Sequence, residues 1–247
     1  MRKIRFHICG AVLLGLCTLS PAFGQTNDTI TKSQADDIVK ELRLIRQMLE
    51  RSIPPPAPPK PTTANVPIPS TDPVLGNKDA PITIVEFTDY QCTFCQRFHM
   101  ATFPEIKKKY IDTGKVRFYS RDMPLDIHAN AFKAAVAARC AGDQNKFWDL
   151  RDVLVANADK LDAASILGYA GKLTMDQAAF KSCVDSKKYE PVVKANLDEA
   201  ARLGVEGTPT FVVGKSSPEG VNGTLVVGAQ LFPTFEKLLD NMLAAKN

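Results

Sequence analysis

Two cysteines separated by two residues are the feature of this sequence best suited to chemistry. They are Cys92 and Cys95, within the stretch VEFTDYQCTFCQRFH, residues 85–99. A strand expected to end near Thr88, and a helix expected to begin near Cys92, put the first sulfur at a helix N-terminus. Free backbone N–H groups and the helix dipole favour thiolate over thiol there. We therefore expect Cys92 to be the exposed nucleophile and Cys95, one turn along, to be the interior resolving thiol.

An acidic residue, Glu86, interrupts the apolar run that leads to these cysteines. Alternation along a strand puts Glu86 on the same face as Ile82 and Ile84. An ionised carboxylate is costly in such surroundings, so we expect a raised pKa and a proton that is mobile near neutral pH. Glu86 is then predicted to relay protons to and from Cys95. The alternative is a carboxylate at a strand end that reaches solvent or a lysine.

His99 lies four residues after Cys95, and the spacing C-x2-C-x3-H is also compatible with a metal site. The sequence offers no evident fourth ligand. We therefore predict that His99 is a partly exposed surface residue, that the protein binds no metal, and that its chemistry uses no cofactor.

The first residues read MRKIRFHICGAVLLGLCTLSPAFGQT. A cationic start, an apolar core over residues 8–19 and the small-x-small pattern AFG predict a secretory signal peptide, residues 1–24. The apolar core is too short for a permanent membrane span. A lipid anchor at Cys17 is the alternative, but Leu16 is not the small residue that such a site requires. We expect export to a bacterial periplasm.

Removal of the predicted signal peptide changes the number of cysteines and the net charge of the mature chain. Four of the 6 cysteines remain after cleavage: Cys92, Cys95, Cys140 and Cys183. An even set in an exported protein favours disulfide chemistry over a zinc site. The signal also carries three basic residues, so the formal net charge falls from +4 to +1 (4 − 3). This charge gives no support for binding to nucleic acid.

A helix is predicted at residues 31–52, within an N-terminal segment, 25–53. Thr31 and Gln34 have the spacing of a capping box, and Asp36 and Asp37 are expected in the first turn. Apolar residues alternate by four and three, which is the seam of a short coiled coil: Ile38, Leu42, Ile45 and Leu49.

A proline-rich linker is predicted next, at residues 54–73. The stretch IPPPAPPKPTTANVPIPSTDP holds nine of the chain's 17 prolines and favours extended polyproline II. A helix separated by such a spacer cannot easily bury its apolar seam on the main domain, so we predict a homo-oligomer formed through residues 31–52. The alternatives are that the helix docks on its own domain or frays.

The remaining residues, 74–247, are numerous enough for one domain with its own core. The pattern predicts strands before and after a helix that Pro104 kinks or breaks, then an alanine-rich helical block, then two short strands and a closing helix. In residue numbers, the strands are expected at 81–88 and 115–121, the helix at 91–110, the block from 129 to about 203, and the closing helix at 233–245.

Three stretches together, VEFTDYQCTFCQRFH, MPLDIHANAFKAAVAARCA and GVEGTPTFVVG, resemble the DsbA-like branch of the thioredoxin superfamily. The resemblance implies an α/β thioredoxin fold with an inserted helical domain, about residues 124–203. It identifies Glu86 with the family's buried acid. It also implies a cis peptide bond between Thr208 and Pro209, in a loop that offers backbone hydrogen bonds to an extended client. By sequence alone, this Thr-Pro pair could equally be an ordinary trans turn.

The resemblance also bears on the other cysteines and on the two residues between Cys92 and Cys95. Strongly oxidising members carry a Pro-His pair where this chain has Thr93 and Phe94, which we expect to contact the client and to give a milder oxidant. Some relatives carry a second cysteine pair in the helical domain, so the simplest interpretation of Cys140 and Cys183 is a structural disulfide. Two free thiols and a second redox pair are the alternatives.

These features predict a periplasmic thiol–disulfide oxidoreductase that acts on unfolded or cysteine-containing exported proteins, with the oxidase direction favoured. The resemblance implies a membrane redox partner, DsbB-like for an oxidase. The closest alternative is an oligomeric disulfide isomerase, kept reduced by a DsbD-like partner. From a different class, the alternative is a non-catalytic holdase or a copper-binding thioredoxin-fold protein.

Overall fold

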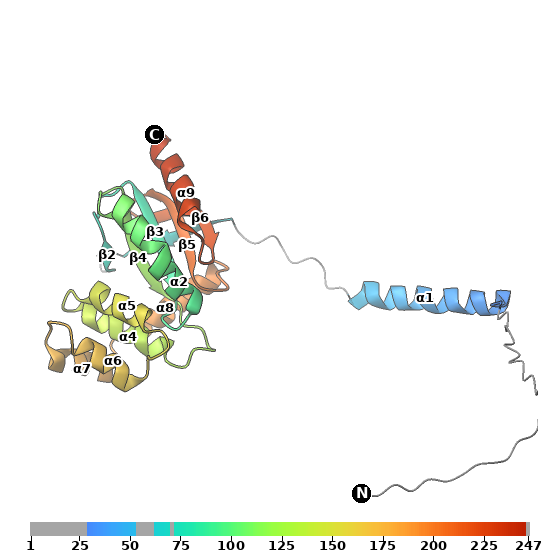
Figure 1. Ribbon diagram of the computed structural model, residues 1–247, viewed down its shortest axis with the longest axis horizontal. Coiled ribbons are helices and arrows are strands. Elements are labelled where there is room, and N and C mark those ends of the chain that lie inside the picture. The colour runs from blue at the N-terminus through green and yellow to red at the C-terminus, as the bar shows by residue number, and fades with distance from the viewer. Residues whose placement is uncertain (1–28, 53–61, 70–71, 246–247) are drawn as a thin grey trace, which may run out of the picture. The chain divides into compact units, whose positions relative to one another are not determined.

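The computed structural model describes residues 29–52, 62–69 and 72–245 (Figure 1). The chain divides into two units, residues 1–58 and 59–247, and each is described by itself. The predicted signal peptide lies outside the described residues, as do residues 53–61 and 70–71 in and next to the predicted linker. In the part of the chain that is described, no helix has the length and apolarity needed to cross a membrane.

The described part of the first unit is one helix, α1 (Lys32–Ser52). Its capping box is confirmed. The Gln34 Oε1 accepts from the Thr31 backbone N–H at 3.0 Å, and the Thr31 Oγ1 accepts from the Gln34 backbone N–H at 3.3 Å. The predicted place of Asp36 and Asp37 is wrong, because a helix that begins at residue 32 has no acidic residue in its first turn.

The predicted seam of α1 lies on its surface. Its four apolar side chains are all about half exposed within the described chain: Ile38, Leu42, Ile45 and Leu49. The helix is therefore amphipathic, and the described residues of its own unit do not cover its apolar face.

The described residues of the second unit fold around a six-stranded mixed sheet, with strand order β1-β6-β5-β3-β4-β2 (Figure 1). Strands β3 and β4 are parallel, and the other neighbouring pairs are antiparallel. All residues of β3 are buried, as its apolar sequence predicts. The strands are β1 (Thr63–Pro67), β2 (Val74–Leu75), β3 (Ile82–Thr88), β4 (Val116–Asp122), β5 (Thr210–Ser216) and β6 (Gly220–Val227).

The predicted start of the domain at residue 74, after a linker over residues 54–73, is wrong by one strand. Strand β1 lies inside the proline-rich stretch and pairs antiparallel with β6, from Thr63 opposite Thr224 to Pro67 opposite Gly220. Ala64 and Val66 are buried, because their side chains alternate inward along the strand. A proline at the end of an edge strand costs no hydrogen bond within the ladder.

Three helical segments follow β3: α2 (Thr93–Ala101), α3 (Phe103–Ile106) and the π-helix η1 (Lys107–Ile111). The break between α2 and α3 agrees with the prediction from Pro104, which lies in the first turn of α3 and has no N–H to continue α2.

Five helices make up the inserted block, and a last helix packs on the sheet. In Figure 1, α4 to α7 gather in one group at one end of the sheet. The bounds are α4 (Ala131–Gly142), α5 (Phe147–Ala156), α6 (Ala163–Ala170), α7 (Gln177–Asp185), α8 (Glu190–Arg202) and α9 (Phe232–Ala244).

The two faces of the sheet carry separate apolar cores. Ile82 and Ile84 pack with side chains from α2, α3, η1 and α9, whereas Val85 and Phe87 pack on the other face with Ala200 of α8. A third core fills the helical block. Since side chains alternate along a strand, the residue after Val85 points toward α2, and that residue is the predicted acid.

Candidate active site

Cys92 is the N-cap residue of α2, directly after the turn that leaves β3. Asp89 shapes this turn. Its backbone carbonyl accepts from the Cys92 N–H at 3.2 Å, and its Oδ1 accepts from the Gln91 N–H at 2.7 Å. The other carboxylate oxygen of Asp89 lies 2.7 Å from the His128 Nδ1 and accepts from the Leu125 N–H at 2.7 Å. The loop after β4 therefore holds the turn that carries the first cysteine.

The expectation that Cys92 is exposed is wrong, since only 5% of the residue is exposed. The loop before β5 covers it: the Thr208 carbonyl oxygen lies 3.4 Å from the Cys92 Sγ. The peptide bond between Thr208 and Pro209 is cis. A partner sulfur must therefore approach Cys92 past this loop.

The surroundings make the Cys92 thiol strongly acidic. They lower its pKa from an ordinary value of 9.0 to about 5. The largest cause is the hydrogen bond from the Cys95 side chain, and the Thr208 side chain and the backbone N–H groups of Cys95 and Phe94 add to it against the opposing effect of burial. The amide contribution is the one expected at a helix N-terminus. Cys92 is therefore a thiolate at neutral pH.

Cys95 has the opposite character. It is completely buried, and its pKa is raised by burial first, then by the hydrogen bond that it gives to Cys92 and by the negative charge of Glu86. Both cysteines are free thiols in this structure. The pair thus consists of one thiolate near the surface and one thiol held in the interior.

Glu86 is fully buried, but the predicted direction of its pKa shift is wrong. Burial raises the pKa of Glu86, yet the interaction with the His99 ring and the positive charge of Arg151 outweigh burial, and the pKa falls below the ordinary 4.5. The His99 Nε2 lies 3.0 and 3.1 Å from the two carboxylate oxygens, and the Arg151 Nη2 donates to one of them. Glu86 is therefore a carboxylate at neutral pH and has no proton to release.

The predicted surface position of His99 is also wrong. Its side chain is only 5% exposed, because α2 turns it inward onto Glu86. Burial lowers the pKa of His99, and the positive charge of Arg151 lowers it further against the opposing effect of Glu86. His99 is therefore neutral at neutral pH. No cluster of three or more His, Cys, Asp or Glu among the residues with described positions has the arrangement of a metal site.

Thr93 and Phe94, the two residues between the cysteines, both lie at the surface. Phe94 is 54% exposed, and the Arg97 guanidinium stacks over its ring at 5.0 Å from the centroid. This pair presents an apolar ring edged by a positive charge beside Cys92.

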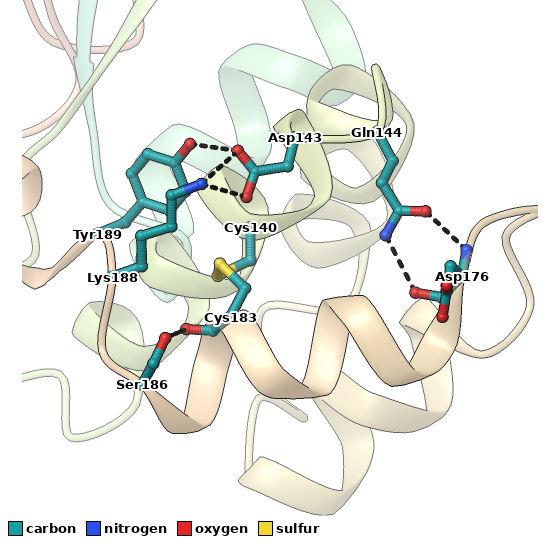
Figure 2. Close-up of a disulfide and its surroundings, with 8 residues drawn as sticks. All are labelled: Cys140, Asp143, Gln144, Asp176, Cys183, Ser186, Lys188 and Tyr189. Carbon is teal, nitrogen blue, oxygen red and sulfur yellow. Dashed lines mark hydrogen bonds and ion pairs between the residues drawn. A yellow bond between two sulfur atoms is a disulfide. The ribbon is translucent and has the colours of Figure 1, made fainter.

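Cys140 and Cys183 form a disulfide that joins α4 to α7, with their Cα atoms 5.7 Å apart (Figure 2). Two polar contacts lie beside it. Asp143 accepts from the Lys188 Nζ at 2.7 Å, and the Gln144 Oε1 accepts from the Asp176 backbone N–H at 2.6 Å. The bridge and these contacts fasten the outer helices of the inserted block to one another.

Arg151 is the site residue that the sequence analysis missed. It lies in the motif FWDLRDVLV on the same face of α5 as the buried Phe147, Leu150 and Leu154. A charged residue on the apolar face of a helix carries the same signal as an acid inside an apolar strand. Together, Arg151 and Glu86 could have been predicted as a buried pair.

Comparison with known proteins agrees with this fold. A family model described as Thioredoxin matches residues 69–240. Among solved structures, the chain resembles α-DsbA1 of Wolbachia pipientis with a TM-score of 0.64 and 27% identity, over 72% of this chain and 92% of that one.

Two curated relatives are similar to part of the chain. The Na(+)/H(+) antiporter NhaA 1 of Salinispora arenicola is 36% identical over 146 residues, which are 59% of this chain and 22% of the relative. The putative protein-disulfide oxidoreductase RC0029 of Rickettsia conorii is 32% identical over 150 residues, which are 58% of this chain and 53% of the relative. The chain therefore spans about half or less of the length of these relatives.

The class of protein is defined by a central sheet, an acidic cysteine at the N-terminus of α2, and a Thr-Pro loop beside that cysteine. The chain belongs to the thioredoxin superfamily. Within that superfamily it is a DsbA-like protein, with the helical domain inserted between β4 and β5.

Proposed function

We propose that this protein is a thiol–disulfide oxidoreductase that exchanges disulfides with exported, cysteine-containing proteins through Cys92 and Cys95, mainly as an oxidase in the periplasm. The observation that carries the proposal is the contrast between the two sulfurs. Cys92 is an acidic thiol at the N-terminus of α2, and Cys95 is a buried thiol of raised pKa. This is the division of roles that thiol–disulfide exchange requires.

The oxidase reaction begins from a disulfide between Cys92 and Cys95. A client thiolate attacks the Cys92 sulfur, the bond between the two cysteines breaks, and Cys95 leaves with the electron pair and binds a proton. A second client thiolate then attacks the client sulfur of the mixed disulfide and releases Cys92. The client loses two electrons and two thiol protons. Cys95 keeps one proton, and the other goes to solvent because Cys92 remains a thiolate.

The low pKa of Cys92 supports the oxidase direction. A thiolate that is stabilised in the reduced protein makes Cys92 a good leaving group and makes the disulfide form the stronger oxidant. The Thr93-Phe94 pair lacks a histidine, and the expected loss of thiolate stabilisation is offset here by Cys95, Thr208 and the backbone amides. A DsbB-like membrane protein is the redox partner that would restore the disulfide.

The surface around Cys92 supports client binding. Phe94 offers an exposed ring, and the loop at Thr208 and Pro209 lies against the sulfur and leads into β5. We assign Thr93, Phe94, Thr208 and Pro209 to client binding and Glu86 to control of Cys95 by its charge. Cys140 and Cys183 are assigned a structural role.

An assay of disulfide exchange tests the proposal. The mature protein should catalyse the reduction of insulin by a small dithiol and the reactivation of reduced or scrambled ribonuclease, and Cys92→Ala should abolish both activities. The matched control is the Cys140→Ala/Cys183→Ala double variant, which keeps the Cys92 pair and should stay active. Full activity in the Cys92→Ala protein would contradict the proposal, and no activity in the unsubstituted protein would favour a holdase or another binding protein.

The exposed seam of α1 favours a second function, that of an oligomeric isomerase kept reduced by a DsbD-like partner. Ile38, Leu42, Ile45 and Leu49 repeat at coiled-coil spacing, and a second copy of the helix is the occupant that this repeat fits. Self-association would present several Cys92 sites to one misfolded client. It is also compatible with an oxidase.

Light scattering on the mature protein tests the assembly. Ile45→Asp should convert an oligomer to monomer, whereas Lys40→Asp, on the same helix away from the seam, should leave the oligomer intact. An identical mass for all three proteins would contradict assembly through α1. The redox state of Cys92 and Cys95 in cells then separates the two activities, since an oxidase is mostly disulfide and an isomerase is mostly dithiol.

A further inference from the structure

Arg151 is a fully buried arginine whose charge reaches the redox site from the inserted helical block. Its guanidinium donates through Nη2 to Glu86 of β3 and through Nη1 to the His99 Nδ1 of α2 at 3.4 Å. Three aromatic rings surround the remaining sides, with centroids 5.2 to 5.9 Å from the guanidinium carbon: Trp148, Phe103 and Phe118. The Arg151 Nε also donates to the Ser120 Oγ at 3.3 Å, and the exposed Asp152 carboxylate lies 3.6 Å from Nη1. Glu86 is therefore the buried acid that compensates this charge in a largely aromatic enclosure.

The Glu86–His99–Arg151 cluster is held together by short contacts. The His99 Nε2 lies 3.0 Å from the Glu86 Oε1 and 2.6 Å from the Arg151 Nη2, and the His99 Nδ1 lies 3.4 Å from the Arg151 Nη1. Burial and the charge of Arg151 lower the pKa of His99, so His99 is a neutral imidazole that contacts both charged partners. The buried cluster consists of one positive group, one negative group and one neutral group, and it carries no net charge.

The groups that face Glu86 from each neighbouring element are few. His99 and Cys95 face it from α2 and Arg151 from α5, and Tyr90 interacts with it from the turn after β3. Its partners in the sheet are the uncharged Ser120 of β4 and Phe211 of β5. Among the residues whose positions are described, Arg151 is thus the permanently charged group that compensates Glu86.

We propose that Arg151 is a positioning residue of the redox site: through its ion pair with Glu86 it keeps a full negative charge beside Cys95 and so prolongs the mixed disulfide on Cys92. The proposal rests on the proposed function. Without Arg151, the buried Glu86 carboxylate would keep its contact with His99 but lose its compensating charge, and it would take up a proton. The charge that disfavours the Cys95 thiolate would then be lost.

The affected step is the attack of Cys95 on the mixed disulfide. The Cys95 thiol gives its proton to solvent, its sulfur bonds to the Cys92 sulfur, and the client sulfur leaves as a thiolate with the electron pair. No outside oxidant is needed, since the mixed disulfide already holds the oxidised sulfur. A slower attack leaves more time for the client's own second thiol, which completes oxidation of the client.

The experiment follows the release of a small thiol from a mixed disulfide on Cys92 in the full mature protein. Because Arg151→Met alone leaves Glu86 buried without its partner, the main variant is the Glu86→Gln/Arg151→Met double, which removes both charges of the pair. Release should be about threefold faster than in the unsubstituted protein, because a Cys95 pKa lower by one unit gives about ten times more thiolate and each thiolate is about threefold less nucleophilic. Arg151→Lys, which keeps the charge, should remain close to the unsubstituted rate.

Arg139→Met is the matched control, because Arg139 is another buried arginine but pairs with Asp122 instead of Glu86. It should lower stability without changing release. Carbon NMR of the Glu86 carboxyl gives an independent readout: it should stay ionised at neutral pH in the unsubstituted protein and become protonated in Arg151→Met.

Two outcomes would overturn the inference: release that is unchanged or slower in the double variant, or a Glu86 carboxyl that is protonated at neutral pH in the unsubstituted protein. Failure to form any mixed disulfide on Cys92 would instead refute the proposed function.

Discussion

The number of protons that the reduced cysteine pair binds is the most discriminating prediction of the structure. Cys92 has a pKa of about 5 and Cys95 has a raised pKa, so the reduced pair holds one proton over the neutral range. A small dithiol with ordinary thiol pKa values holds two. Reduction of the protein by such a dithiol therefore releases one proton, and each pH unit above 5 should favour the reduced protein tenfold more.

The assay is the equilibrium between the protein and the dithiol, measured from about pH 6 to about pH 8, below the ordinary thiol pKa of about 8.5. The tenfold change corresponds to about 30 mV per pH unit relative to the dithiol, since two electrons are transferred. The Cys140→Ala/Cys183→Ala variant should give the same slope, because the slope belongs to the active-site pair. A flat response would show an ordinary Cys92 thiol, and a hundredfold change per pH unit would show that Cys95 is ionised as well.

Four further predictions concern stability. The reduced protein should lose stability as the pH falls from about 9 toward 5, because the pKa of Cys92 is lower in the folded protein than in the unfolded chain. The oxidised protein should lack this dependence, and denaturation curves of both forms would test it. Loss of the Cys140–Cys183 bridge, which spans 43 residues, should cost about 4 kcal/mol in denaturant unfolding, and unchanged stability would contradict a structural role. Asp176→Ala should cost about 1 kcal/mol by removing the cap of α7, whereas Asp176→Asn keeps a capping oxygen and should cost less. Phe211→Ala should cost about 3–5 kcal/mol, and a loss under about 1 kcal/mol would show that the core between the sheet and α9 is loosely packed.

The parts of the fold that local pattern determines could be predicted from the sequence. The apolar run of β3, the place of Cys92 before α2 and the break near Pro104 each depend on neighbouring residues. Strand β1 could not be predicted this way. Its partner strand, β6, lies far along the chain, and the prolines around β1 favour the prediction of an extended linker when the pairing strand is not known.

The charges of the site depend on contacts between residues far apart in the chain, and these contacts cannot be predicted from local sequence pattern. Glu86 inside a strand correctly indicated a buried acid, but the direction of its pKa shift is determined by Arg151, 65 residues away. The covering of Cys92 likewise depends on Thr208, 116 residues away. His99 is different: its position one turn after the inward-facing Cys95 on α2 could have indicated an inward side chain, although we predicted a surface residue.

Titration of the reduced protein, followed by the ultraviolet absorbance of the Cys92 thiolate, tests the central claim most directly. The account predicts a single transition with a midpoint at about pH 5 that disappears in the Cys92→Ala variant. A protein whose thiolate forms only at about pH 8.5, as in an unfolded peptide, would contradict it.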